Sequence, residues 1–172
     1  MPAVALIPDW LKKWGPIALA VGLVSFMYAR GEGAGSMSGR IAPDFTLPRL
    51  GGGDFTLSKL DGKVRVLDFW ATWCGPCKMM TPHLVDLHKK YYAKGVVVVG
   101  IALDDAADVQ RYVEEHGVPY PIVLGDGSVA ERFGGVQGIP TTFVLDRGGR
   151  VVKRHVGYRP LLILEADVAP LI

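Results

Sequence analysis

Apolar runs of strand length recur from residue 64 onward and predict the strands of a sheet. Val64 to Trp70 (VRVLDFW) is nearly continuous and is broken only by Arg65 and Asp68. Val96 to Leu103 (VVVVGIAL) has no polar side chain, which predicts a strand buried on both faces and therefore a central member of a parallel pair. Shorter strands are predicted at 121–124, 141–146 and 151–156, and a turn at 146–149 joins the last two into a hairpin.

Between these runs the apolar residues recur at helical spacing. A helix is predicted from about residue 74 to residue 93, where Met79, Leu84 and Leu87 form the apolar positions and Pro82 introduces a kink. Shorter helices are predicted at 106–116, at 128–133 and in the apolar tail 160–172. Strand–helix alternation followed by a terminal hairpin implies an α/β fold, with a sheet that is parallel at its centre, an antiparallel edge and helices on both faces.

A short repeat precedes this pattern. The tetrapeptide DFTL occurs at 44–47 and again at 54–57, on either side of three glycines at 51–53. Alternating apolar and β-prone residues around a glycine turn predict two short strands. We expect this hairpin to cover one end of the sheet.

The first 40 residues have a different pattern. An uncharged apolar run from Ile17 to Ala29 follows two adjacent lysines and precedes a Gly/Ser-rich stretch at 31–39 (GEGAGSMSG). The flanking lysines and the flexible exit favour a membrane segment at 1–30. It is either an uncleaved anchor or, because the strict apolar run has only 13 residues, a cleavable signal peptide; a soluble amphipathic helix is the third interpretation. We therefore expect a linker at 31–39 and a globular domain at 40–172.

Both membrane interpretations place the domain outside the cytoplasm. Two lysines precede the apolar run and one arginine, Arg30, follows it, which favours an N-terminus on the inside. The expected location is the cell membrane, with a single pass and the domain facing the periplasm or the exterior. Signal cleavage would instead give a secreted or periplasmic protein.

Composition restricts the classes of function. Hydrophobic residues make up 49% of the chain and charged residues 21%, as in folded globular proteins. The 19 basic and 17 acidic side chains give a net charge of +2, which does not favour a nucleic-acid partner. Two cysteines are too few for a disulfide scaffold.

The two cysteines, Cys74 and Cys77, lie where a predicted strand passes into a predicted helix. A thiol at a helix N-terminus meets unpaired N–H groups and the positive end of the helix dipole, which lower a thiol pKa from about 8.5 toward neutrality. Because the thiolate is the attacking species, Cys74 is predicted to be the nucleophile and Cys77, one turn later, the resolving thiol. Pro76 stiffens this turn and lacks an N–H that would be left unpaired.

Other uses of the two cysteines are less favoured. A structural disulfide across two residues would stabilise little, because the stabilisation grows with loop length. Zinc would need two further ligands, and the chain has no second cysteine pair. His83 and His88 show no convergent spacing with Cys77 and are predicted to be surface or helix-flank residues. Copper bound through both thiols stays open, but a working redox pair is the favoured interpretation and no metal is expected.

Three parts of the chain resemble the thioredoxin superfamily. Residues 73–78 (WCGPCK), preceded by DFWA at 68–71, resemble the thioredoxin active-site region. Residues 139–141 (IPT) resemble the cis-proline loop that stands opposite the dithiol. The opening hairpin and the exported anchor resemble the membrane-anchored TlpA/ResA group of thiol:disulfide oxidoreductases, and the resemblance covers about residues 40–158.

This resemblance implies a thioredoxin-like fold, with a central mixed sheet flanked by helices and an N-terminal β-hairpin. It also implies thiol–disulfide exchange outside the cytoplasmic membrane, which in this group usually reduces cysteines of apocytochrome c or of copper-site proteins. The expected partners are a disulfide-containing substrate protein and a membrane electron donor. We expect no cofactor and a monomeric protein.

The resemblance further assigns roles to two carboxylates. Asp68, inside an apolar strand, would be a buried base of raised pKa that takes the proton of Cys77; an exposed edge carboxylate is the alternative. Many anchored relatives carry Asn here, so Asp68 is a departure toward cytosolic thioredoxin that supports a reductant. Asp104 falls near a position where some anchored relatives have an acidic residue beside the dithiol, and a solvated helix cap fits it equally well.

Substrate binding is expected around the dithiol. Trp73 and Ile139 would form an apolar rim, and a substrate could pair as an extra strand with the Ile139 backbone if the bond to Pro140 is cis. An ordinary turn proline is the alternative. Lys78 would add modest positive potential.

Three competing functions remain. A thiol peroxidase shares the N-terminal hairpin, but its Pro-x-x-x-Thr-x-x-Cys motif is matched here by Leu67 and Ala71. A copper-binding assembly factor would take up metal stoichiometrically through its thiols. An oxidase or isomerase could use the same fold, but Gly75-Pro76 is the dipeptide of thioredoxin, whose potential is about −270 mV against about −120 mV for the oxidant DsbA. The dipeptide therefore favours a reductant.

Overall fold

The computed structural model describes residues 37–172, and the membrane segment predicted at 1–30 lies outside the described residues. The chain is packed from Met37 on. Met37 is buried, and the N–H of Gly39 donates to the carbonyl of Val151. Residues 37–39, which composition assigns to the linker, therefore pack with the domain. Within the described range no helix is both long enough and apolar enough to cross a bilayer.

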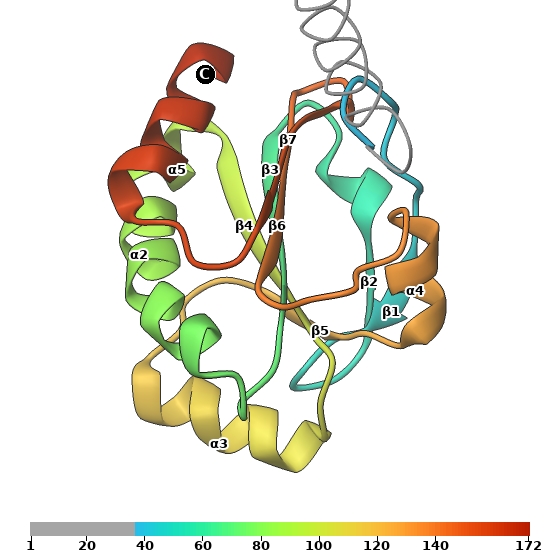
Figure 1. The fold of residues 1–172 in the computed structure, drawn as a ribbon, viewed down its shortest axis with the longest axis vertical. Coiled ribbons are helices and arrows are strands. Elements are labelled where there is room, and N and C mark those ends of the chain that lie inside the picture. Colours follow the sequence, from blue (N-terminus) through green and yellow to red (C-terminus); the bar gives the residue numbers. More distant parts are fainter. Residues whose placement is uncertain (1–36) are drawn as a thin grey trace, which may run out of the picture. The chain divides into compact units, whose positions relative to one another are not determined.

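Five strands form one mixed sheet in the order β5-β4-β3-β6-β7 (Figure 1). Their bounds are β3 Val64–Trp70, β4 Val96–Ala102, β5 Ile122–Leu124, β6 Thr141–Leu145 and β7 Val151–Val156. β3, β4 and β5 run parallel, whereas β6 pairs antiparallel with both β3 and β7. Every residue of β4 is buried, and β4 lies between two parallel neighbours. The predicted buried strand and the predicted sheet with an antiparallel edge are both confirmed.

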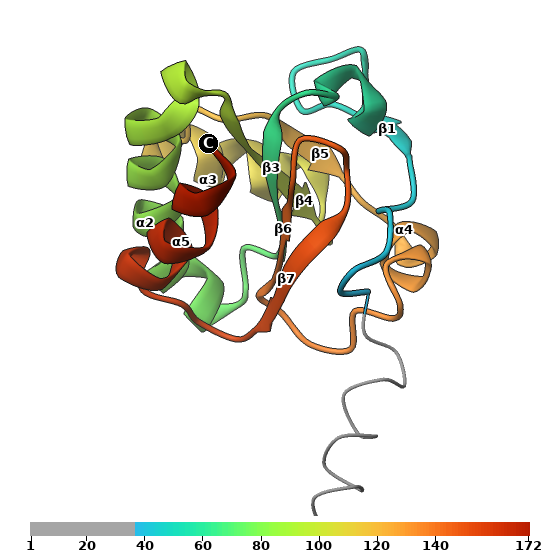
Figure 2. The ribbon, with the colours of Figure 1, turned by 90° about the horizontal axis from the view of Figure 1, so that it is seen from above.

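Helices cover both faces of this sheet (Figure 2). The elements are α2 Gly75–Tyr91, α3 Ala106–His116, α4 Gly127–Arg132 and α5 Leu161–Val168, with short 3-10 helices η1 Leu57–Leu60, η2 Tyr92–Lys94 and η3 Ala169–Leu171. Leu84 of α2, Tyr112 of α3 and Leu164 of α5 belong to one apolar core, which we call the α2-side core. Val129 of α4 belongs to a second one on the opposite face, the α4-side core.

Strand β3 separates the two cores. Val66 and Trp70 belong to the α2-side core, whereas Leu67 and Phe69 belong to the α4-side core. Successive side chains of a strand point to opposite faces, so Asp68 lies on the α2 side between Val66 and Trp70. A carboxyl group is thus built into the middle of the sheet.

The N-terminal repeat forms the predicted hairpin. β1 (Thr46–Pro48) and β2 (Asp54–Thr56) pair antiparallel as a separate two-stranded sheet. Leu47 is buried in the α4-side core, and the N–H of Leu50 donates to the carbonyl of Ile122 in β5. The hairpin therefore lies along edge strand β5 and over one face, not over the end of the sheet as expected. At this place its apolar residues pack against the part of the α4-side core that α4 does not cover.

The predicted apolar face of α2 is wrong at one position. Met79 is 61% exposed, whereas Met80 is completely buried. Met80 shares a face with Leu84 and Leu87 because residues four and seven apart lie on the same side of a helix. Because the two methionines are adjacent, the sequence alone did not show which of them faces the core.

Candidate active site

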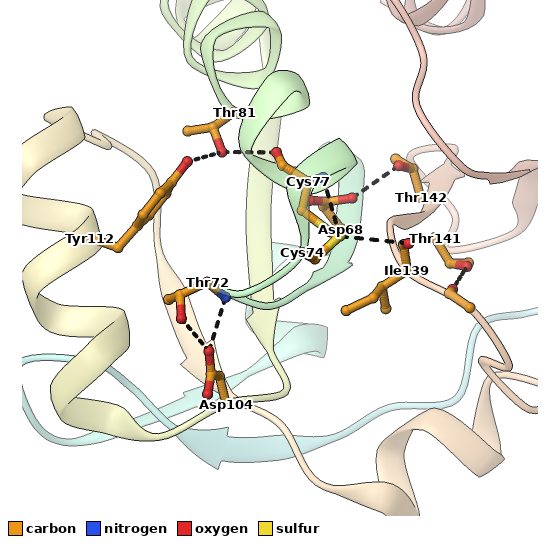
Figure 3. The surroundings of a disulfide bond; sticks show 11 residues. Asp68, Thr72, Cys74, Cys77, Thr81, Asp104, Tyr112, Ile139, Thr141 and Thr142 are labelled. Carbon is orange, nitrogen blue, oxygen red and sulfur yellow. Dashed lines mark hydrogen bonds between the residues drawn. A yellow bond between two sulfur atoms is a disulfide. The ribbon is translucent and has the colours of Figure 1, made fainter.

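Cys74 and Cys77 form a disulfide at the start of α2, with an S–S distance of 2.07 Å (Figure 3). Cys74 is the N-cap of the helix, and its Sγ accepts the backbone N–H of Cys77 at 3.2 Å. Gly75 and Pro76 open the helix between them. The structure thus holds the oxidised form of the pair. Once the bond is reduced, the helix N-terminus and this N–H favour negative charge on the Cys74 sulfur.

The pair is nearly covered, whereas the residue before it is open. Cys74 is 5% exposed and Cys77 is 2% exposed, but Trp73 is 70% exposed. Lys78 is also exposed. A large apolar side chain left in solvent beside a nearly covered sulfur offers a contact surface for another protein.

The loop before β6 faces the nucleophile (Figure 3). The Ile139–Pro140 peptide bond is cis, as predicted. The carbonyl oxygen of Ile139 lies 3.7 Å from Cys74 Sγ, and the Ile139 side chain is half-buried. The loop is held on both sides, because the N–H of Gly157 donates to the Pro140 carbonyl at 2.7 Å and the Thr141 hydroxyl donates to the Gly138 carbonyl at 2.6 Å. The backbone of residue 139 is therefore fixed beside the sulfur.

Asp68 is buried beneath this region and is drawn among the surroundings of the disulfide in Figure 3. It is 4% exposed, so the predicted burial is confirmed and the exposed edge carboxylate is excluded. Burial raises its pKa from 3.8 to about 7, although the hydrogen bond from the Thr142 hydroxyl to Oδ1, 3.0 Å long, acts in the opposite direction. The group therefore changes its protonation near neutral pH.

In the described part of the chain, Asp68 has no ion-pair partner. Its partner across the β3–β4 ladder is Gly100, where a side chain would meet Ile122 Cδ1 at 2.5 Å and Trp70 Nε1 at 2.9 Å. Burial, and then the negative charge of Asp68, raise the pKa of the nearby Tyr120 phenol well above 10. The carboxyl thus lies among apolar side chains of the α2-side core, near a neutral phenol and with a hydrogen bond from the Thr142 hydroxyl.

Asp104 fixes the segment that leads to the dithiol. Its Oδ2 accepts the N–H of Thr72 at 2.9 Å and the Thr72 hydroxyl at 2.5 Å (Figure 3). Burial alone would raise the pKa of Asp104, but the bonds from Thr72 and from the N–H of Asp105 outweigh it and lower the pKa. The helix-cap alternative is wrong for this residue, because Asp105 caps α3 through the N–H of Ala107. Asp104 instead anchors the backbone just before Trp73.

A second polar contact ties α2 to α3. The Thr81 hydroxyl donates to the carbonyl of Cys77 at 3.2 Å, and the Tyr112 hydroxyl donates to Thr81 Oγ1 at 3.0 Å (Figure 3). The first turn of α2, which carries the resolving cysteine, is thereby held against α3.

The two histidines of α2 differ in position. His88 is buried, its Nδ1 accepts the N–H of Val98 in β4 at 3.3 Å, and burial lowers its pKa. The prediction of a surface residue is wrong for His88, because an imidazole can supply a hydrogen bond to β4 from inside the core. His83 is part-buried and shares a 2.8 Å hydrogen bond with the Tyr158 hydroxyl. No group of three or more His, Cys, Asp or Glu side chains in the described part of the chain could hold a metal ion.

The sequence profile of the AhpC/TSA family matches residues 38–154, well over half of the chain. The chain belongs to this family.

Several proteins similar to this chain are thiol–disulfide redox proteins by name. The chain is 34% identical over 120 residues to thiol-disulfide oxidoreductase ResA of Bacillus thuringiensis (strain Al Hakam), and the match covers 69% of each protein. It is 32% identical over 143 residues to ResA of Halalkalibacterium halodurans, covering 82% of this chain and 81% of the relative. The crystal structure of thiol:disulfide interchange protein DsbE from Chlorobium tepidum superposes with a TM-score of 0.74 at 37% identity, covering 78% of this chain and 96% of that one. The fold is therefore thioredoxin-like, and the protein is a thiol-disulfide oxidoreductase with a Cys74–Cys77 pair.

The sequence did not point to three side chains of the site. They are Thr142, which donates to Asp68, Thr72, which donates to Asp104, and Tyr112, which donates to Thr81. Thr72 could have been suspected from its place next to Trp73. Thr142 could be found only from the register of β3 against β6, which aligns it with Asp68.

Proposed function

We propose that this protein is an extracytoplasmic reductase of protein disulfides, held at the membrane by residues 1–30. Cys74 is the nucleophile, Cys77 the resolving thiol and Asp68 the base. The observation that carries the proposal is a dithiol at a helix N-terminus above a buried carboxyl whose pKa is raised to about 7.

The first step is attack on the substrate. The Cys74 thiolate attacks one sulfur of a substrate disulfide, forms a mixed disulfide and releases the other substrate sulfur as a thiolate, which takes a proton from solvent. The helix N-terminus favours the thiolate before attack. Trp73 provides apolar contact, and the fixed backbone of Ile139 can pair with an extended substrate segment.

The second step resolves the intermediate. Asp68 takes the proton of Cys77, and the Cys77 sulfur attacks Cys74 Sγ and displaces the second substrate sulfur as a thiolate. That thiolate takes a proton from solvent, and Asp68 later releases its own proton to solvent. The products are the Cys74–Cys77 disulfide and a substrate dithiol, so two electrons pass from the protein to its substrate. A base with a pKa near 7 suits this transfer at neutral pH, and general bases typically contribute about 10²–10⁴-fold.

The dipeptide between the cysteines favours reduction over oxidation. Gly75-Pro76 is the dipeptide of thioredoxin, a low-potential dithiol. A buried base that assists Cys77 speeds the resolving step in both directions, so it does not set the direction of electron flow. The resemblance to the TlpA/ResA group points to apocytochrome c or copper-site proteins as substrates, and continued turnover requires a membrane electron donor that returns the disulfide to the dithiol.

The test is to trap the substrate. Cys77→Ser can form the mixed disulfide but cannot resolve it, so full-length Cys77→Ser expressed in the native host should carry covalently bound proteins that dithiothreitol releases. Cys74→Ser is the matched control and should carry none. Mass spectrometry of the released proteins identifies them, and exported proteins with paired cysteines are expected.

Several results would contradict the proposal. Exclusively cytoplasmic partners would refute the location, and equal trapping by Cys74→Ser would refute the assignment of the two thiols. Stoichiometric copper uptake without disulfide reductase activity would replace the proposal with a copper-binding assembly factor.

A further inference from the structure

Thr142 is the polar side chain that the fold turns toward Asp68. The two residues are directly opposite in the β3–β6 ladder, and the Thr142 hydroxyl donates to Asp68 Oδ1 at 3.0 Å (Figure 3). Thr142 is completely buried, so bulk water does not compete for the bond. A hydroxyl has one proton to donate, and this bond uses it.

The same strand also holds the loop at the nucleophile. Ile139, whose carbonyl oxygen is 3.7 Å from Cys74 Sγ, comes three residues before Thr142. Thr141 lies between them, and its hydroxyl donates to the Gly138 carbonyl at 2.6 Å. Because side chains alternate along a strand, Thr141 and Thr142 point to opposite faces of the sheet. One threonine therefore fixes the loop, and the next one contacts the buried carboxyl.

We propose that Thr142 is a positioning residue for Asp68: its hydroxyl orients the carboxyl, stabilises the ionised form and sets the pH range in which Asp68 can take the proton of Cys77. The inference rests on the proposed role of Asp68 as the base. A hydrogen bond donated to a carboxylate favours its charged form, and this is the direction in which the Thr142 bond acts on the pKa of Asp68. Gly100 is opposite Asp68 on β4, so of the two residues paired with Asp68 across the neighbouring strands only Thr142 has a side chain.

Other titratable groups lie on this side of the sheet. They are Cys74, Cys77, His88 and Tyr91 of α2, Tyr112 of α3, Tyr120 before β5, and His155 of β7, which is opposite Thr142 in the β6–β7 ladder. Burial raises the pKa of Tyr112 and of Tyr120, so these phenols stay neutral through the relevant range, and burial lowers the pKa of His88. His155 bonds a carboxylate of α5 at 2.6 Å. A test must therefore observe Asp68 itself and must keep the thiols from titrating.

The first measurement meets both needs. In the oxidised full-length protein the thiols are absent, and the ¹³C shift of the Asp68 carboxyl reports its own ionisation. The wild-type midpoint is expected near 7. Thr142→Val keeps the shape but removes the donor, so its midpoint should rise by about one pH unit. Thr142→Ser keeps the donor and should stay close to the wild type.

Thr141→Val is the matched control. It removes an equally buried hydroxyl from the adjacent residue on the opposite face, so it should leave the Asp68 midpoint unchanged. If Thr142→Val does not fold, Thr142→Ala removes the same donor with less bulk and gives the same measurement.

The second measurement links ionisation to chemistry. A midpoint raised by one unit lowers the ionised fraction at pH 7 from about half to about a tenth, so resolution in Thr142→Val should be about fivefold slower. Stopped-flow reduction of a model disulfide should show this slower resolution with an unchanged rate of attack by Cys74. In an Asp68→Asn background the Thr142→Val change should have no further effect on resolution.

The outcomes separate the two proposals. An unchanged Asp68 midpoint in Thr142→Val overturns the role of Thr142, even if Asp68→Asn slows resolution and Asp68 remains the base. If Asp68→Asn resolves at the wild-type rate at every pH, the base assignment fails, and with it the link from Thr142 to resolution. A midpoint raised equally by Thr141→Val and Thr142→Val would show a general disturbance of β6 and would also overturn the proposal.

Discussion

Replacing Asp68 with Asn should stabilise the protein at alkaline pH and have almost no effect on stability at pH 4. Asn keeps the volume of the side chain and an oxygen that can accept the Thr142 hydroxyl, but it cannot ionise. The difference in the free energy of unfolding between the variant and the wild type therefore measures what ionisation of Asp68 costs the fold.

The magnitude follows from the raised pKa. Burial raises the pKa of Asp68 from 3.8 to about 7 in the folded protein, with the Thr142 bond opposing it. The folded state thus binds this proton more tightly than the unfolded chain does, and the protonated group contributes stability that is complete below pH 3.8. That contribution falls as the pH rises through the interval between the two pKa values and is lost above about 7. At about 1.4 kcal/mol per pKa unit, the total is about 4 kcal/mol.

The assay is denaturant unfolding of oxidised full-length wild type and Asp68→Asn, followed by circular dichroism at several pH values from 4 to 8.5. The oxidised form removes the titration of the thiols. All other groups titrate alike in both proteins, so the difference isolates residue 68. We expect it to grow from near zero to about 4 kcal/mol in favour of Asn, with equal denaturant slopes for both proteins.

A difference that stays constant across this range would refute the reasoning, because it would show that Asp68 has a similar pKa in the folded and unfolded states. A wild type more stable than Asp68→Asn at pH 8 would refute it more strongly. In that case the ionised carboxyl would be a structural hydrogen-bonding group, and a base of raised pKa would be misassigned.

Three further results are expected. Iodoacetamide should modify Cys74 before Cys77 when the reduced protein is titrated from low pH, because only Cys74 lies at the helix N-terminus; equal labelling of both thiols would contradict their assigned roles. Asp104→Ala removes the acceptor of the Thr72 N–H and of the Thr72 hydroxyl, so it should lower the free energy of unfolding in urea by about 1–3 kcal/mol. It should also slow reduction of a model disulfide without moving the titration midpoint of Asp68. Unchanged stability and rate would show that this contact is dispensable. Burial lowers the pKa of His88, so the neutral imidazole contributes stability that is complete above about pH 6.5 and declines as the pH falls below it. When the pH falls from 6.5 to 5, His88→Gln should therefore lose less stability than the wild type. Parallel plots of unfolding free energy against pH for the two proteins would argue against this.

The backbone was largely predictable because its signals are local. β4 is buried on both faces, so its apolar run is unbroken and its location follows from residues 96–102 alone. The bounds of α3 and β7 likewise match the predicted 106–116 and 151–156. Where the local signal was degenerate, prediction failed, as with Met79 and Met80, which differ by one position and not in chemistry.

The partners of the site residues were not predictable, because they come from distant parts of the chain. The identity of the dithiol follows from two residues at fixed spacing, but the contact between Asp68 and Thr142 joins positions 74 residues apart. It depends on the register of β3 against β6, and a shift of one residue would turn Thr142 to the other face. The same holds for His88, whose partner is a backbone N–H of β4 and has no signature in the side-chain sequence.

The position of Asp68 links the stability of the fold to its proposed chemistry. An ion pair with a cation would lower the pKa of the carboxyl and make its burial less costly, but it would also make Asp68 a poor base near pH 7. None of the ion pairs among residues 37–172 includes Asp68, and a side chain at Gly100, opposite it on β4, would meet Trp70 and Ile122. The fold supplies a neutral hydroxyl instead, which holds the carboxyl in place while leaving its pKa near 7. A side chain at Gly100 should therefore destabilise the fold, because it would meet Trp70 and Ile122 of the α2-side core, and it would also change the surroundings of Asp68 on the neighbouring strand.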